Sequence, residues 1–418
     1  MTRFLTAALL STALCSPACA VEPAEVVAHY ADLAAAKYGD SLTTAKALQS
    51  AVSGLIATPS DAALQAAREA WLAARVPYQQ TEVYRFGNAV VDDWEGRVNA
   101  WPLDEGLIDY VAAGSAVNEE NTHAALNVIA TPKFILSGAE VDATVITPDL
   151  IGKTLHEADG IEANVASGYH AIEFLLWGQD LNGTGPGAGA RPYTDFVDGD
   201  GCTGGNCDRR AAYLQAVTDL LVADLDVMVA QWGAEGAGRT AVTADPNVGL
   251  MAILTGMGSL SYGEQAGERM KLGLMLNDPE EEHDCFSDNT HNSHFYDGLG
   301  IRNVYLGQYT RLDGTQMTGP SLSELVAAKD AAVDAQLKTE LDASVTALQA
   351  IKTAAEEGFA YDQMLEAGNK QGEALVMGAV NALVTQTASI ERAVTVLGLS
   401  KVDFEGSDSL DNPNAVFQ

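Results

Sequence analysis

The sequence has few basic residues for its length. Lysine and arginine together number 23 among 418 residues, against 57 aspartates and glutamates, so the formal net charge is −34. A chain of this charge repels the phosphates of nucleic acids and the anionic headgroups of lipids, and we expect no nucleic-acid partner. The same charge favours cations near the surface, and it also helps to keep a protein soluble.

Long hydrophobic runs are absent after residue 20, and no later run reaches the roughly 20 residues that span a bilayer. Residues 1–20 themselves have the pattern of a cleaved export signal. Arg3 supplies the positive start, Phe4 to Leu14 the apolar segment, and Ala18-Cys19-Ala20 the small-residue cleavage site. We therefore expect an exported protein of the periplasm or cell envelope, with no transmembrane segment in the mature chain.

Cysteine is also scarce, with five in the chain. Cys15 and Cys19 fall within the export signal, and their preceding residues are poor for lipid attachment, so a lipid anchor is the less favoured alternative. Cys202 and Cys207 enclose a short glycine-rich loop, and export permits a disulfide across it. A zinc-binding pair is the alternative, although no second pair follows to complete four ligands. Cys285 is then left unpaired.

Strand-like alternation is almost absent, and helical spacing dominates the chain. The length exceeds what one hydrophobic core usually serves and predicts two domains. The glycine-rich segment 181–206 is the expected linker between an N-terminal bundle at 21–180 and a C-terminal bundle at 207–418. Both halves have helices on either side of an irregular aromatic segment, which suggests a duplication. The expected fold is all-α, with two helical-bundle domains.

Three of the expected boundaries matter below. One long helix is expected at 62–86, with a kink at Pro77. Another is expected at 248–276, although several glycines interrupt it. The tail, 404–418, is expected to fray.

His170 and Glu173 stand three residues apart in the apolar, helix-forming segment 161–180. Three residues is just under one helical turn, so both side chains leave the same face, about 5–6 Å apart at Cβ. Burying an imidazole and a carboxylate without partners is costly. His-x-x-Glu on a helix is a workable pair of metal ligands, as the reverse order is in di-iron bundles. The alternative is a structural pair, because the pattern by itself is common.

A second polar stripe lies on the helix expected at 62–86. Trp71, Arg75, Tyr78 and Glu82 follow at helical spacing and should share one face. Core stripes are normally aliphatic, so this one indicates a partly buried polar surface. Glu82 is the preferred third metal ligand, and Arg75 is its expected charge partner. An internal Arg–Glu bridge is the alternative, although seven residues is a long span for it.

Two further polar segments lie in the second half. Glu264, Glu268 and Lys271 follow helical spacing, with Arg269 beside them, and by themselves they would form a solvated charged face. Residues 281–294 are dense in histidine, aspartate and cysteine. They could form a second metal site, but a loop whose side chains cap neighbouring helices is the favoured interpretation. No phosphate loop, dinucleotide fingerprint or Ser/His/Asp order is evident.

Several motifs in a fixed order resemble the imelysin family over nearly the whole chain. They are Gly168-Tyr-His170-Ala-Ile-Glu173, Trp71-x3-Arg75-x-Pro-Tyr78-x3-Glu82, Trp101-Pro-Leu-Asp104-Glu, Gly263-Glu-Gln-Ala-Gly-Glu-Arg269 and His283-Asp-Cys-Phe-Ser-Asp-Asn-Thr-His291. The resemblance implies an all-helical envelope protein with a polar site where two domains meet. It also implies a role in iron or haem acquisition, and the family is catalogued as metallopeptidases.

Three hypotheses follow for function. The first is an iron-acquisition protein that binds iron or zinc at His170, Glu173 and Glu82, with haem as an alternative cargo and envelope iron-uptake components as partners. The second is a zinc peptidase with the same ligands and Glu173 or Glu82 as base, although two ligands from one motif leave a zinc site incomplete. The third is a metal-free module that binds a ligand or partner. The expected supporting residues are Gly168, Trp71, Arg75, Tyr78, Asp104, Glu264, Glu268 and Arg269.

Overall fold

The computed structural model describes residues 21–114 and 121–417, so the expected export signal lies outside the described residues. Within them the chain is mostly helical, and the expectation of an all-α protein is confirmed. Two short antiparallel hairpins are the exceptions. They pair β1 (Lys133–Leu136) with β2 (Ala139–Asp142), and β3 (Gln308–Thr310) with β4 (Gln316–Thr318).

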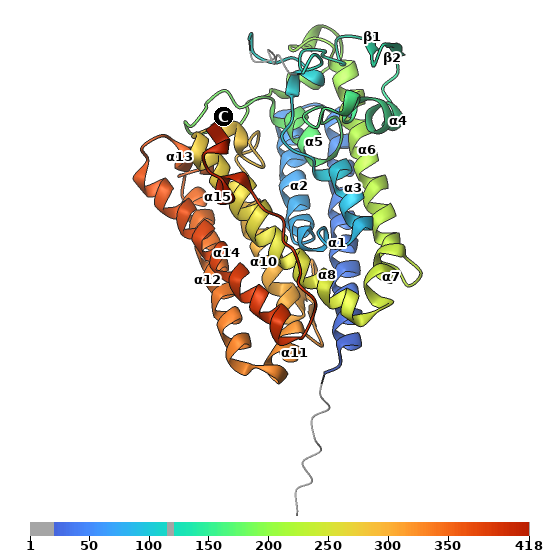
Figure 1. The fold of residues 1–418 in the computed structure, drawn as a ribbon. Coiled ribbons are helices and arrows are strands. Elements are labelled where there is room, and N and C mark those ends of the chain that lie inside the picture. The colour runs from blue at the N-terminus through green and yellow to red at the C-terminus, as the bar shows by residue number, and fades with distance from the viewer. Residues whose placement is uncertain (1–20, 115–120, 418) are drawn as a thin grey trace, which may run out of the picture.

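One group of helices comes mainly from the first half of the chain (Figure 1). The longest, α1 (Pro23–Ala57), packs along α2 (Asp61–Gln79) and α6 (Cys207–Gln231). The shorter α5 (Gly168–Trp177) packs against both α2 and α6, and α3 (Ala89–Asn99) packs against α5 and α6. Each helix buries an apolar stripe in this interior, which is how amphipathic helices stabilise a bundle.

A second group comes from the later half of the chain. It contains α8 (Pro246–Ser259), which continues as η7 (Leu260–Leu272), with α10 (Thr290–Leu306), α12 (Ala331–Glu356) and α14 (Lys370–Val396). Here α12 packs against α10 and α14, and α14 packs against η7. The remaining elements are short: η1 (Glu82–Tyr84), η2 (Glu105–Leu107), α4 (Pro148–Leu150), η3 (Ile151–Leu155), η4 (Ala158–Gly160), η5 (Tyr193–Phe196), η6 (Gly199–Gly201), α7 (Ala237–Thr243), α9 (Gly273–Leu276), η8 (Pro279–Glu281), α11 (Leu322–Lys329), α13 (Tyr361–Leu365), α15 (Asp408–Asp411) and η9 (Ala415–Phe417).

The glycine-rich segment 181–206 does not separate the two groups. The helix that follows it, α6, packs against α1 and α5 and so lies among the N-terminal helices. The main hydrophobic core is also continuous from Val26 to Val394. Packing therefore assigns α6 to the first group, whereas the sequence placed 207–418 in one C-terminal bundle. The division into two domains and the duplication stay predictions.

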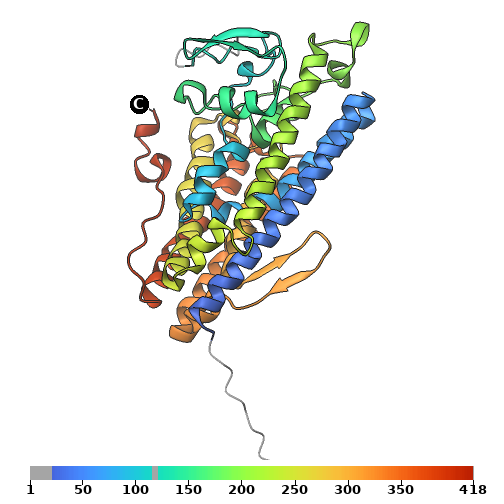
Figure 2. The same ribbon diagram turned by 90° about the vertical axis from the view of Figure 1, so that its right-hand side faces the viewer.

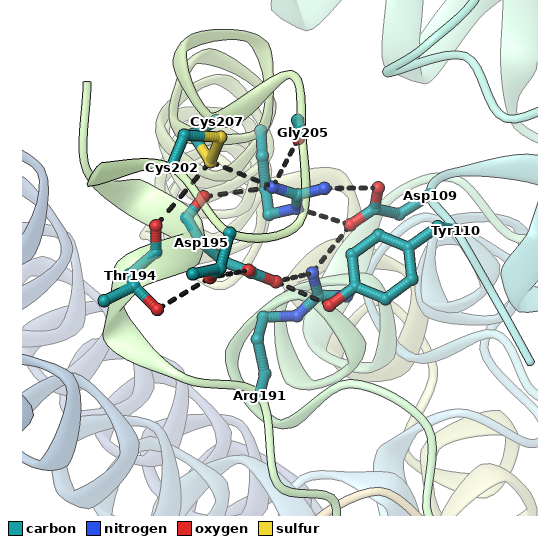
Figure 3. Close-up of a disulfide and its surroundings, with 10 residues drawn as sticks. Asp109, Tyr110, Arg191, Thr194, Asp195, Cys202, Gly205 and Cys207 are labelled. Carbon is teal, nitrogen blue, oxygen red and sulfur yellow. Dashed lines mark hydrogen bonds and ion pairs between the residues drawn. A yellow bond between two sulfur atoms is a disulfide. The ribbon is translucent and has the colours of Figure 1, made fainter. Parts of the chain in front are cut away.

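Buried charges hold the glycine-rich segment against α6 (Figure 3). A disulfide joins Cys202 and Cys207 just before the helix begins. Arg210 of α6 binds both carboxylate oxygens of Asp109, at 2.6 and 2.9 Å. Arg191 reaches the same carboxylate at 2.8 Å and that of Asp195 at 3.1 Å. Two arginines thus share two aspartates, so each buried charge has an opposite charge beside it.

The structure ends α2 at Gln79, seven residues before the expected end. Pro77 lies in the last turn, where it cannot donate the helical hydrogen bond to the carbonyl four residues earlier. The backbone N–H and the hydroxyl of Thr81 then donate to the carbonyl of Tyr78, at 2.7 and 2.6 Å, and close the helix. Glu82 consequently leaves the α2 stripe and lies in η1.

The glycine-rich helix expected at 248–276 changes from α-helical to π-helical hydrogen bonding in its middle. Residues 260–272 form the π-helix η7, whose hydrogen bonds span five residues rather than four. Glycines on it permit a close neighbour: a Cβ at Gly263 would lie 2.5 Å from the carbonyl oxygen of Glu405, and one at Gly267 would lie 2.3 Å from Cβ of Ser407. Residues 405–410 of the tail therefore pack along η7 on the outside of the molecule, and the expectation that the tail frays is wrong for them (Figure 2). Gln418 lies outside the described residues.

Lys37 is a buried lysine in the middle of α1, and it should reduce stability at neutral pH. Its Nζ donates to the carbonyl of Gln80 at 3.0 Å and lies over the ring of Tyr84. Burial lowers the pKa of Lys37 from 10.5 to about 7. Between these values the unfolded chain holds more protons than the folded chain, so stability should rise with pH across this window.

We expect Lys37→Met to raise the free energy of unfolding by about 1–4 kcal/mol at pH 6 and to flatten its dependence on pH between 7 and 10. Urea unfolding across this range measures both effects. Lys46→Met, at an exposed position of the same helix, is the control and should keep the slope of the wild type. Equal slopes in Lys37→Met and wild type would contradict the prediction.

Candidate functional site

The polar site lies where α5 meets the loop between η8 and α10. His170 and Glu173 of α5 face His283 and Asp284 of that loop, and all four side chains are buried. One ligand atom each from His170, His283 and Asp284 lies within 4.8 Å of the others. Helices from early in the chain and a loop from late in it therefore bring two imidazoles and a carboxylate together.

Gly168 allows α5 to begin where it does. Its φ is +82°, and a Cβ at this position would lie 2.4 Å from the carbonyl oxygen of Val98 in α3. Only glycine meets both conditions without strain. Next to it, the hydroxyl of Ser167 donates to the carbonyl of Arg97 at 2.9 Å. The first turn of α5 is thus pressed against α3, and this contact places His170 in the interior.

Arg75 supplies the positive charge of the site. Its guanidinium donates to Oδ1 of Asp284 at 2.8 Å and to Oδ1 of Asn99 at 2.6 Å. The rings of Trp71, Tyr78 and Tyr169 surround it, with centroids 5.6, 5.7 and 5.0 Å from the guanidinium carbon. The expected stripe on α2 is therefore real as far as Tyr78, and it cradles an arginine whose partner is Asp284.

The two carboxylates differ in their surroundings. Glu173 accepts from the backbone N–H and the hydroxyl of Ser287, at 2.9 and 2.6 Å, and lies 3.2 Å from Nδ1 of His170. Burial and the nearby Asp284 raise the pKa of Glu173 well above its usual value. Burial also acts to raise the pKa of Asp284, but Arg75 and hydrogen bonds outweigh burial and lower it. Asp284 is therefore the carboxylate that stays ionised most readily.

Both imidazoles are held in their neutral form. Burial and the charge of Arg75 lower the pKa of His170 to about 3. Burial, Arg269 and His170 lower that of His283 well below its usual value. Within the described part of the chain, Nε2 of His170 and Nδ1 of His283 have no hydrogen-bond partner. A neutral imidazole with a free nitrogen is the form that binds metal ions.

Glu82 lies elsewhere, in a second charged cluster around Arg269. The guanidinium of Arg269 contacts Glu82 at 2.7 Å, Glu264 at 2.7 Å and Asp297 at 3.1 Å. Glu264 and Arg269 are five residues apart, which is the spacing of the π-helix. The structure thus gives Glu82 an arginine as its partner instead of His170. Glu82 leaves the α2 stripe because α2 ends before residue 82. The residues that lie beside His170 are instead His283 and Asp284.

The other expected residues fall into two sets. Gly168 and Arg75 border the His170 cluster, and Trp71 and Tyr78 pack around Arg75. Asp104 lies in the loop before η2, where the side-chain amide of Asn121 donates to it. Glu268 lines an open cleft beside Arg269.

Sequence reasoning missed the roles of His283, Asp284, Asn99 and Ser287. The density of polar residues at 281–294 was a usable signal, but a helix-capping loop was the favoured interpretation. The loop does satisfy its own backbone, since Thr290 accepts from the N–H of Asp284 at 3.0 Å. Its His283 and Asp284 nevertheless point at α5, and only tertiary packing reveals that.

These residues could hold one cation. Two neutral imidazoles and one carboxylate are a three-ligand set of the kind that binds zinc or iron and leaves further positions for water. The fit rests on the mutual spacing of the ligand atoms and on the two imidazole nitrogens without partners. The fold and the site thus define a helical-bundle protein with a candidate metal centre at a buried helix–loop contact.

The chain belongs to the imelysin family, whose model matches residues 34–390. Among curated proteins, it is 34% identical over 71 residues to iron-regulated protein A of Synechococcus elongatus. That match covers 17% of this chain and about a fifth of the relative.

Two solved structures share the fold. The first, described as an iron-regulated protein A precursor from Parabacteroides distasonis, superposes with a TM-score of 0.64 at 19% identity and covers 90% of this chain and 95% of its own. The second, an imelysin-like protein from Psychrobacter arcticum, has a TM-score of 0.56 at 15% identity and covers 92% and 99%. Among the described helices, none is long and apolar enough to cross a membrane.

Proposed function

We propose that this protein is an exported metal-binding protein of iron acquisition, and that His170, His283 and Asp284 bind the metal ion. The observation that carries the proposal is the buried convergence of these three ligand groups within 4.8 Å. The names of its relatives favour iron, because two are described as iron-regulated. Zinc suits the same ligand types.

Glu173 has a different part in this proposal. Its Oε2 lies 3.2 Å from Nδ1 of His170, so these two atoms share a hydrogen bond. This contact orients the ring and leaves Nε2 free to bind, as carboxylates beside metal-binding histidines commonly do. Ser287 holds the other oxygen, Oε1, so the carboxylate has little freedom to turn.

The burial of the site argues for an ion rather than a larger molecule. His170, His283 and Asp284 are 1%, 2% and 0% exposed. A zinc peptidase would use the same ligands with Glu173 as base, but a polypeptide must reach the metal, and these exposures do not allow it. Haem needs a broad apolar pocket beside its ligand. The charged neighbours Arg75, Glu173 and Asp284 suit a small cation better.

Metal stoichiometry tests the proposal. Purified protein, stripped of metal and titrated with Zn²⁺ or Fe²⁺ under anaerobic conditions, should bind one buried ion. His170→Ala and His283→Ala should each abolish that binding event, because each removes one of three ligands. His123→Ala is the matched control, since its imidazole pairs with Asp159 away from the cluster. Unchanged stoichiometry in both cluster variants would overturn the proposal.

A further inference from the structure

A cleft of about 650 Å³ opens beside the buried cluster. Its walls come from α3, from Trp101 and Pro102, from residues 157–162 and from η7 and η8. Eight of its 17 lining residues are acidic and two are arginines. The excess of carboxylates along low-dielectric walls concentrates cations inside such a cleft.

One imidazole belongs to both the cleft and the cluster. His283 lines the cleft and is also one of the three converging ligands. It is 2% exposed, its Nδ1 has no partner among the described residues, and its Nε2 lies 3.4 Å from Nδ2 of Asn99. The ring of Trp101 covers it edge-on, with centroids 5.8 Å apart. The cleft therefore ends on a buried histidine whose hydrogen-bonding capacity is unfilled.

The carboxylates of the cleft fall into paired and unpaired groups. Arg85 binds Asp92 at 3.0 Å and Glu95 at 3.5 Å, and Glu264 is held by Arg269. In contrast, Glu268 of η7 and Glu281 of η8 form no ion pair with any described lysine, arginine or histidine. Both of these acids line the same cleft. These two acids repel each other, and a cation between them would relieve the repulsion.

We infer that this acidic cleft is the entry path of the cation, with Glu268 and Glu281 as a weak outer site and His283 as the residue that passes the ion to the cluster. The inference rests on the proposed metal site and adds the path by which the cation reaches that site. Partly exposed carboxylates attract an ion over a distance comparable to the Debye length, about 8–10 Å at physiological salt. They act mainly on the association rate, because the ion finally rests elsewhere.

The association rate of Co²⁺ tests the inference. Stopped-flow absorbance follows Co²⁺ as it gains visible absorption on binding imidazole. Glu268→Gln with Glu281→Gln should lower the association rate constant about tenfold in 20 mM salt, and the difference should shrink in 500 mM salt. The buried cluster should still bind one ion, because the variant leaves His170, His283 and Asp284 in place. The control pair, Asp226→Asn with Glu235→Gln, removes the same charge outside the cleft and should bind at the wild-type rate.

Two failures are distinguishable. If wild type binds Co²⁺ at the cluster but the cleft variant and the control associate equally fast, the entry path is wrong while the metal site stands. If His170→Ala binds Co²⁺ as wild type does, the metal site itself is wrong and the route falls with it. An equal loss of rate in the cleft variant and the control would show a general charge effect and would also overturn the inference.

Discussion

Replacing Gly168 with alanine is expected to lower the free energy of unfolding by about 2–5 kcal/mol. The new Cβ would lie 2.4 Å from the carbonyl oxygen of Val98, and a φ of +82° adds strain of its own. Because the clash is with backbone rather than with a flexible side chain, α5 must move to relieve it. That movement would carry His170 away from Asp284, so metal affinity should fall together with stability.

Urea unfolding and Zn²⁺ titration of Gly168→Ala measure the two losses. Gly39→Ala is the matched control, because Gly39 lies within α1 and a Cβ there has no atom within 4 Å. Alanine at that position should stabilise the protein by about 0.5–1 kcal/mol. If Gly168→Ala were as stable as wild type, the close contact between α5 and α3 would be wrong.

Removing Asp109 is expected to have a similarly large effect, about 3–5 kcal/mol, because it leaves buried positive charge without its partner. Asp109 receives 2.6 and 2.9 Å hydrogen bonds from Arg210 and a 2.8 Å bond from Arg191. Among the described residues, Asp109→Ala leaves Arg210 with backbone partners and no carboxylate at hydrogen-bonding distance. Thermal and urea unfolding at neutral pH measure the loss.

The pH dependence of the stability lost in Asp109→Ala shows whether the loss comes from the ionised carboxylate. Burial acts to raise the pKa of Asp109, but the two arginines outweigh burial, and the folded-state pKa lies below its ordinary 3.8. The unfolded chain therefore takes up protons first as pH falls, so the stabilisation by Asp109 is complete above about pH 4 and declines below it. Asp142→Ala is the control, because the pair of Asp142 with Lys133 is exposed to solvent and its loss should change stability far less. Equal losses in both variants would contradict the prediction.

The parts of the site within one helix were predictable. His170 and Glu173 lie three residues apart on α5, and the structure places Nδ1 and Oε2 3.2 Å apart. Trp71, Arg75 and Tyr78 likewise share the face expected of them on α2. Helical geometry decides both results, since residues three, four and seven apart lie on one side of any α-helix.

The carboxylate that completes the buried cluster was not predictable by the same rule. Glu82 was placed by extending α2 beyond Gln79, and the turn at Thr81 removes it from that helix. Asp284 comes from a loop more than 100 residues after α5. No local pattern relates two such segments, because their contact depends on how the whole bundle packs.

By itself, then, the sequence determined the helical class, the family motifs and the pairing of His170 with Glu173, because these depend on periodicity over a few turns. The tertiary structure alone decided that Asp284 and His283 complete the cluster, that Glu82 pairs with Arg269, and that the tail packs along η7. The physical reason is that long-range contacts depend on how the whole chain packs. One arrangement has to accommodate the close contact at Gly168, the π-helix at 260–272 and the buried charge of Arg75 together.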